Sequence, residues 1–202
     1  MEISATLVKD LRLRTGAGVM ECKSALEEAK GDMERAMAIL RERGVTKAAA
    51  KTGRVAAEGQ IVAYVHPGGR IGVLLELNCE TDFVARTEQF QVLAKDVAMH
   101  IAAMSPLYTR REEVPEAVLE EERRIFRVQA EGSGKPSHAV ERMIQGRLEK
   151  FFGEVCLEEQ PFVRDQDRTV GQVIKEAIST IGENIIIRRF CRYQLGEAFE
   201  GR

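Results

Sequence analysis

The sequence carries little net charge and no long apolar run, and each absence excludes a class of protein. The net charge of its 202 residues is −2, whereas a domain that binds nucleic acid is usually strongly basic. No apolar stretch approaches the roughly 18 residues that cross a membrane. Residues 1–9 show no charged start followed by an apolar core, so no secretory signal is expected. These features predict a cytoplasmic protein that contacts neither nucleic acid nor membrane directly.

Cysteine and histidine are scarce and widely separated. The sequence has four cysteines and three histidines. They are Cys22, Cys79, Cys156, Cys191, His66, His100 and His138. None has the close spacing of a CxxC redox motif or of a metal-binding set. We therefore expect no metal site and no cofactor, and four free thiols that are mostly buried.

Motifs for chemical catalysis are missing as well. The sequence has no Walker A loop, no dinucleotide fingerprint after a strand, and no metalloprotease or hydrolase motif. The segment Thr15–Gly18 resembles a phosphate loop only superficially, because it lacks the following lysine and the preceding strand. Glu76 and Glu80 could form a carboxylate pair, although two solvated strand positions are the commoner reason for such a spacing. We predict that the protein is not an enzyme and has no catalytic residue.

Residues 1–44 predict three short helices around a small core. The helices are expected at about 4–15, 19–29 and 32–44. Ser4 or Thr6 can cap the first helix, Asp32 can cap the third, and Gly44 is expected to close the third. A bundle of this size at one end of a longer chain is typical of a docking module.

The remainder of the chain predicts a basic linker and then a mixed core. Residues 45–57 are rich in alanine and lysine and are expected to form a helical linker, followed by an α+β core at 58–202. The expected core elements are strands at 61–65 and 71–77, a helix from Thr87 to Ser105, two helices within 115–155 separated near 132–136, an extended segment at 160–163, a helix from Thr169, and a strand at 185–195. This order predicts an antiparallel sheet packed with helices.

Phe83 is unusual, because it lies between a strand end and a helix start, where loops are normally polar. One interpretation is that Phe83 folds inward and staples the following helix, as residues before an N-cap often do. Its position alone favours that structural role. Alternatively, Val84 is the staple and Phe83 projects into solvent.

Three segments of the sequence resemble signatures of the bacterial elongation factor Ts family. They are Leu11–Lys23, Leu74–Arg86 and Gly182–Tyr193, and the shorter stretch Glu159–Val163 is similar too. The resemblance runs from about residue 3 to residue 196. Long motifs in the right order and with the right separation make it highly specific.

The resemblance implies a guanine-nucleotide exchange factor that binds elongation factor Tu with GDP and promotes release of the nucleotide. It implies that residues 1–44 form a ubiquitin-associated-like domain that holds the GTPase, with contacts from Arg12, Val19 and Met20, here called the docking patch. It also implies that Asp82 and Phe83 disturb the partner's Mg²⁺ site. Thr81 and Val84 then hold the segment Thr81–Val84, here called the tip, in shape.

At this length the chain resembles the short form of the family, without a second core subdomain. An apolar final strand, Ile185–Tyr193, would expose an edge that needs a partner. We therefore expect a homodimer formed through this sheet, which makes a two-plus-two complex with elongation factor Tu. Cys191 could cross-link the two copies, although a free thiol is the commoner state in the cytosol. A non-catalytic dimeric binding module, docked through its N-terminal helices, is the alternative to an exchange factor.

Overall fold

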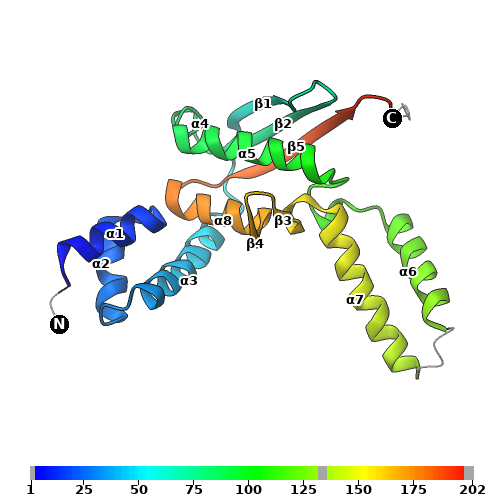
Figure 1. Cartoon of the computed structure of the whole chain (residues 1–202), viewed down its shortest axis with the longest axis horizontal. Coiled ribbons are helices and arrows are strands. Elements are labelled where there is room, and N and C mark those ends of the chain that lie inside the picture. The colour runs from blue at the N-terminus through cyan, green and yellow to red at the C-terminus, as the bar shows by residue number, and fades with distance from the viewer. Residues whose placement is uncertain (1–2, 132–135, 198–202) are drawn as a thin grey trace. The chain divides into compact units, whose positions relative to one another are not determined.

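The computed structural model describes residues 3–131 and 136–197, so most of the predicted break at 132–136 lies outside the described residues. The chain forms two compact units. The first contains residues 1–60, 78–91 and 173–186, and the second contains residues 61–77, 92–172 and 187–202. Because the chain passes from one unit to the other five times, neither unit is a continuous segment of sequence. Figure 1 shows the elements of both units.

The first unit begins with three helices: α1 (Ala5–Thr15), α2 (Val19–Glu28) and α3 (Met33–Lys51). The Ser4 hydroxyl accepts a hydrogen bond from the Leu7 N–H, and the Asp32 carboxylate accepts one from the Arg35 N–H, which confirms both predicted caps. The helices share a core of small and aliphatic side chains: Val8, Leu11, Cys22, Ala25, Leu26, Ala29 and Ala36. Three short helices therefore have an apolar centre of their own.

The predicted end of the third helix at Gly44 is wrong, because α3 continues to Lys51 and takes in half of the expected linker. Gly44 has a different function in packing. A side-chain carbon added there would lie 3.1 Å from the Ser179 hydroxyl oxygen of helix α8 (Val170–Ile181). The glycine therefore lets a second helix approach closely, and the helix tolerates it.

The remainder of the first unit joins two pieces that are distant in sequence. Residues 78–91 contain the last residues of strand β2 (Ile71–Cys79), the one-turn helix α4 (Asp82–Ala85) and the start of helix α5 (Glu88–Met104), and residues 173–186 contain most of α8 and the turn after it. The Thr87 hydroxyl accepts a hydrogen bond from the Phe90 N–H, as its predicted capping role requires. The tip therefore lies in the same unit as the three N-terminal helices.

The second unit contains a sheet in which the strands follow the order β1-β2-β5, with β1 at Glu58–Val65 and β5 at Ile186–Gln194. The His66 N–H donates to the Ile71 carbonyl across the predicted hairpin turn. The Leu195 N–H donates to the Arg70 carbonyl, so the end of β5 lies beside the start of β2 and these strands are antiparallel. Among the described strands, β5 is an edge strand. The sheet and its helices confirm the predicted α+β class.

Helix α5 runs along one face of this sheet (Figure 1), and its predicted inner face is buried. The side chains concerned are Phe90, Leu93, Ala94, Val97, Ala98 and Ile101. On β2, Val73, Leu75 and Leu77 alternate as buried residues, as a half-covered strand requires. The Arg192 guanidinium of β5 donates to the Ala102 carbonyl of α5, which ties the helix to the strand.

A helical hairpin and a small ribbon complete the second unit. The hairpin consists of α6 (Glu116–Glu131) and α7 (Ser137–Val155), and short 3-10 turns lie at Arg111–Glu113 and Leu157–Glu159. Strand β3 (Pro161–Phe162) pairs antiparallel with β4 (Asp165–Thr169), a strand that the polar sequence of 165–169 does not suggest. The Thr169 hydroxyl accepts from the Gln172 N–H, which confirms the predicted cap of α8.

Candidate functional site

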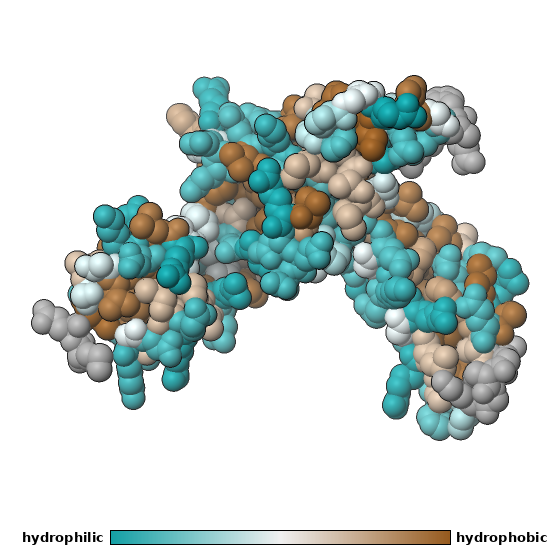
Figure 2. Space-filling view, viewed as in Figure 1, coloured by the Kyte–Doolittle hydropathy of each residue, from teal (hydrophilic) through white to brown (hydrophobic). Residues whose placement is uncertain are grey.

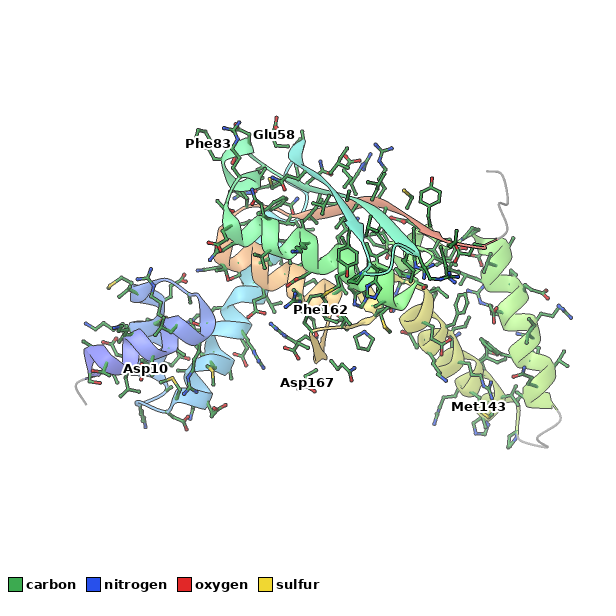
Figure 3. The ribbon with its side chains drawn as sticks, turned by 45° about the horizontal axis from the view of Figure 1, so that its top comes forward. Asp10, Glu58, Phe83, Met143, Phe162 and Asp167 are labelled. Atoms are coloured by element: carbon green, nitrogen blue, oxygen red, sulfur yellow. The ribbon has the colours of Figure 1, made fainter. Side chains whose placement is uncertain are left out.

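The tip is a single helical turn that presents one large apolar side chain to solvent. The Thr81 hydroxyl accepts a hydrogen bond of 3.4 Å from the Val84 N–H and so caps α4. Phe83 is 79% exposed, and in Figure 3 its side chain projects from the turn into solvent. A phenylalanine held so far out of the core makes no contribution to folding that explains its presence.

The interpretation that Phe83 folds inward as a staple is therefore wrong. Ala85 takes the inward position of this turn and is only 4% exposed, and Val84 is half-buried. The Gln60 side-chain N–H of β1 donates to the Ala85 carbonyl at 2.8 Å, which holds that side of the turn against the strand. Since the inward place is filled by a small residue, the bulkier neighbour points outward.

Asp82 lies beside Phe83 and is accessible. Its carboxylate accepts a hydrogen bond of 2.8 Å from the Arg86 guanidinium, one turn further along the chain. The Asp82 side chain is 48% exposed and the Arg86 side chain is 75% exposed. An ion pair this open to water contributes little to stability, so a partner can take up the Asp82 carboxylate at small cost.

Glu183 holds the base of the tip, and sequence reasoning missed it. Its carboxylate accepts three hydrogen bonds: from the Glu80 N–H at 3.1 Å, the Thr81 N–H at 3.0 Å and the Thr81 hydroxyl at 2.7 Å. In return, the Glu80 carboxylate accepts the Asn184 N–H at 2.7 Å. Glu80 and Thr81 lie in the motif at 74–86, and Glu183 and Asn184 lie in the motif at 182–193. The presence of both motifs in the sequence was the available indication that these residues act together.

The same contacts settle the carboxylate pair considered from the sequence. Glu80 bonds to the Asn184 N–H and lies 3.6 Å from the Arg54 guanidinium, whereas Glu76 forms a 2.6 Å ion pair with Arg189. Each carboxylate therefore has its own structural partner. They do not form an acid–base pair.

Cys79 is a buried thiol beside the tip. It donates a hydrogen bond to the Thr81 carbonyl at 3.1 Å. Burial raises the pKa of the Cys79 thiol, and the negative charge of Glu183 raises it further. The group therefore stays protonated at neutral pH, keeps its hydrogen bond and is a poor nucleophile. Cys22 and Cys156 are also buried, whereas Cys191 is exposed.

The docking patch lies where α1 ends and α2 begins. All three of its residues are exposed: Val19 to 47%, Met20 to 73%, and Arg12 on the last turn of α1. Leu13, which sequence reasoning did not select, is 75% exposed in the same segment. The Thr15–Gly18 segment only connects the two helices, since Gly16 ends α1 in the left-handed conformation and Gly18 begins α2.

The described parts of the chain contain no cluster of His, Cys, Asp and Glu that could hold a metal ion. In residues 3–131 and 136–197, none of the helices is both long and apolar enough to cross a membrane.

Comparison with known proteins connects this geometry to a family. The family model described as Elongation factor TS matches residues 19–197. The protein named "Elongation factor Ts" of Carboxydothermus hydrogenoformans is 60% identical over 195 residues, covering 96% of this chain and 90% of that protein. Its namesake in Desulforamulus reducens is 59% identical over 201 residues, covering 100% and 93%. The one in Thermoanaerobacter pseudethanolicus is 57% identical over 198 residues, covering 98% and 97%.

Proposed function

The chain belongs to the elongation factor Ts family, and on that basis we propose that it is a guanine-nucleotide exchange factor for elongation factor Tu. In this proposal it binds the GDP-bound GTPase and promotes GDP release, so that GTP can bind during translation elongation. The observation that supports the proposal most directly is Phe83, 79% exposed on a turn whose backbone is held on both sides.

The tip acts on the partner's Mg²⁺ site. Mg²⁺ demands nearly ideal octahedral geometry and links the nucleotide phosphates to the GTPase, so a small displacement of its protein and water ligands weakens nucleotide binding sharply. Phe83 supplies a rigid apolar wedge, whose burial contributes roughly 1.5–3 kcal/mol. That energy corresponds to about a 10- to 100-fold change in nucleotide affinity.

Asp82 adds a negative charge to the wedge. Its ion pair with Arg86 is open to water, so the carboxylate can exchange this partner for polar groups of the GTPase. Thr81 and Val84 shape the turn, the first through its cap and the second through its half-buried side chain. Asp82 and Phe83 therefore act on the partner, and Thr81 and Val84 hold these two side chains in place.

The docking patch binds the GTPase domain of the partner. Val19 and Met20 offer apolar surface and Arg12 offers a charged fork, the combination that dominates many protein interfaces. Since the factor weakens nucleotide binding, linkage requires that nucleotide weaken the binding of the factor equally. GTP therefore releases the factor after exchange, and the protein needs no catalytic residue of its own.

The protein forms a homodimer through the outer face of its sheet. Ile61 and Val65 on β1, Leu74 on β2 and Tyr193 on β5 are between 46% and 71% exposed, and are here called the exposed sheet face. Figure 2 shows hydrophobic residues at the surface over the β1–β2 hairpin. Burying such a face between two copies favours association, and with two partner molecules it gives the two-plus-two complex.

Release of labelled GDP from purified elongation factor Tu tests the proposal. Added wild-type chain should accelerate release by orders of magnitude, and the double variant Asp82→Ala, Phe83→Ala should bind Tu yet accelerate little. Glu42→Ala, which removes an exposed carboxylate of α3, is the matched surface control and should behave as wild type. If the double variant releases GDP as fast as wild type, the wedge mechanism fails. If wild-type chain binds Tu without accelerating release, the protein is a binding module only.

A further inference from the structure

The tip cannot maintain its own conformation, so its geometry depends on contacts from elsewhere. Helix α4 has four residues, and an isolated helix of one turn is unstable in water. Its most prominent side chain, Phe83, is largely exposed and stabilises the turn little. A wedge that must displace ligands of a metal ion needs a fixed position, since a misplacement of about 1 Å can cost about 100-fold in rate.

We propose that Glu183 is the positioning residue of the tip, acting through Thr81, and this inference rests on the proposed exchange function. The Thr81 hydroxyl donates its proton to the Glu183 carboxylate at 2.7 Å. Its lone pairs then face the Val84 N–H, from which the same oxygen accepts a bond at 3.4 Å. Glu183 thereby orients the Thr81 hydroxyl, which caps α4 by binding the N–H of the residue after Phe83.

Glu183 also binds the backbone where β2 ends. The N–H groups of Glu80 and Thr81 both donate to one carboxylate oxygen, at 3.1 and 3.0 Å. Hydrogen bonds to an ionised acceptor are about twice as strong as neutral ones. Because the Glu80 carboxylate in turn accepts the Asn184 N–H at 2.7 Å, the two segments hold each other in both directions.

The turn that carries Glu183 is itself attached to the end of α3. The Lys51 ammonium donates to the Gly182 carbonyl, and the Asn184 side chain donates to the Arg54 carbonyl at 2.8 Å. Gly182 has a φ of +94°, a conformation that glycine adopts without strain. Residues 182–184, here called the anchor turn, therefore bond to the tip on one side and to the C-terminal end of α3 on the other.

This arrangement gives the anchor turn a role in exchange. Docking through α1 and α2 brings the partner to the same compact unit that holds the tip, and the anchor turn keeps the tip at a set place within that unit. Loss of Glu183 should leave the docking patch intact and release the tip. The expected defect lies in the exchange step and leaves partner binding almost unchanged.

The test measures GDP release from Tu as a function of chain concentration for Glu183→Ala, Glu183→Gln and the control Glu42→Ala. Glu183→Ala should lower the saturating release rate by about tenfold or more, the factor that about 1.4 kcal/mol represents. The half-saturating concentration should change by less than about twofold. Glu183→Gln, whose amide oxygen still accepts both backbone N–H groups but whose amide nitrogen cannot accept the Thr81 hydroxyl proton, should give an intermediate rate, and Glu42→Ala should match wild type.

Amide hydrogen exchange in the isolated chain supplies a readout independent of the partner. The amides of Glu80 and Thr81 should exchange about tenfold faster in Glu183→Ala than in wild type. If Glu183→Ala does not fold, Thr81→Val, which removes the bridging hydroxyl alone, should lower the saturating rate in the same way. An unchanged saturating rate, or a loss that appears only in the half-saturating concentration, overturns the role of Glu183. An inactive wild-type chain overturns the exchange function, and the amide exchange then still decides whether Glu183 holds the tip.

Discussion

Under the proposed wedge mechanism, replacing Phe83 by alanine should slow GDP release from the partner but leave the free energy of unfolding almost unchanged. Phe83 is 79% exposed, so only about a fifth of its surface is removed from water on folding. Full burial of a phenylalanine contributes roughly 1.5–3 kcal/mol, which leaves about 0.3–0.6 kcal/mol for this residue. Alanine also has the higher helix propensity by about half a kcal/mol, and α4 is a helical turn. The two effects nearly cancel.

Phe90 is the matched control, because it is the same residue type seven positions later on α5 and is fully buried. Phe90→Ala removes a buried ring and should cost about 3–5 kcal/mol, the usual range for this change in a core. In a chain of this length 1 kcal/mol shifts the melting temperature by about 2–4 °C. Phe83→Ala should therefore melt within about 2 °C of wild type, whereas Phe90→Ala should melt roughly 10 °C lower.

Urea denaturation and GDP release, measured on the same preparations, decide whether the Phe83 ring contributes to stability or to nucleotide exchange. We expect Phe83→Ala to keep the wild-type free energy of unfolding within about 0.5 kcal/mol and to lose most of its acceleration of GDP release. A loss of stability above about 2 kcal/mol would show that the ring packs inward, and its contribution would be structural. Wild-type acceleration by Phe83→Ala would refute the wedge.

Two further predictions concern the second unit. His100 is buried, and its Nδ1 accepts a hydrogen bond from the Val163 N–H, so its Nε2 donates to the Gln160 side-chain oxygen. Burial lowers the pKa of His100 below its ordinary value of 6.5, although the hydrogen bond to Gln160 acts in the opposite direction. As the pH falls, the unfolded chain binds a proton at this histidine before the folded chain does. The contribution of neutral His100 to the free energy of unfolding is therefore complete above pH 6.5 and is lost as the pH falls below it. The melting temperature should fall between pH 6.5 and 5, and it should fall less steeply in His100→Gln. On the exposed sheet face, Leu74→Asp should turn a dimer into a monomer in sedimentation at micromolar concentration. The control Val128→Asp, at an exposed apolar position of α6, should leave the dimer intact. A wild-type chain that sediments as a monomer would contradict the dimer.

Local chemistry explains the elements that sequence reasoning predicted correctly. Capping residues such as Ser4, Asp32 and Thr169 satisfy backbone N–H groups within three residues of themselves, so a short window of sequence contains all the information needed. The alternation of Val73, Leu75 and Leu77 likewise records which face of the strand is covered. The family could also be identified from the sequence, because each of its motifs is a continuous stretch of residues.

The errors share a different cause, because each depends on a partner outside the short segment that shows the pattern. Gly44 looks like a helix end, yet the helix continues past it, and the absence of a side chain there lets Ser179 of α8 pack closely. The polar strand β4 exists because it pairs with Pro161 and Phe162. Neither partner can be read from the local pattern, which for glycine and for polar runs predicts turns.

The tip shows both kinds of information within a few residues. The sequence alone determined that an apolar side chain stands at the junction of a strand and a helix, and its motif identified the family. Only the tertiary structure decided that Phe83 points outward, because Ala85 fills the inward place and Gln60 holds its carbonyl. It also decided that Glu183, about a hundred residues away, binds the base of the turn. The physical reason is that a single turn has no stability of its own, so distant hydrogen bonds set its orientation.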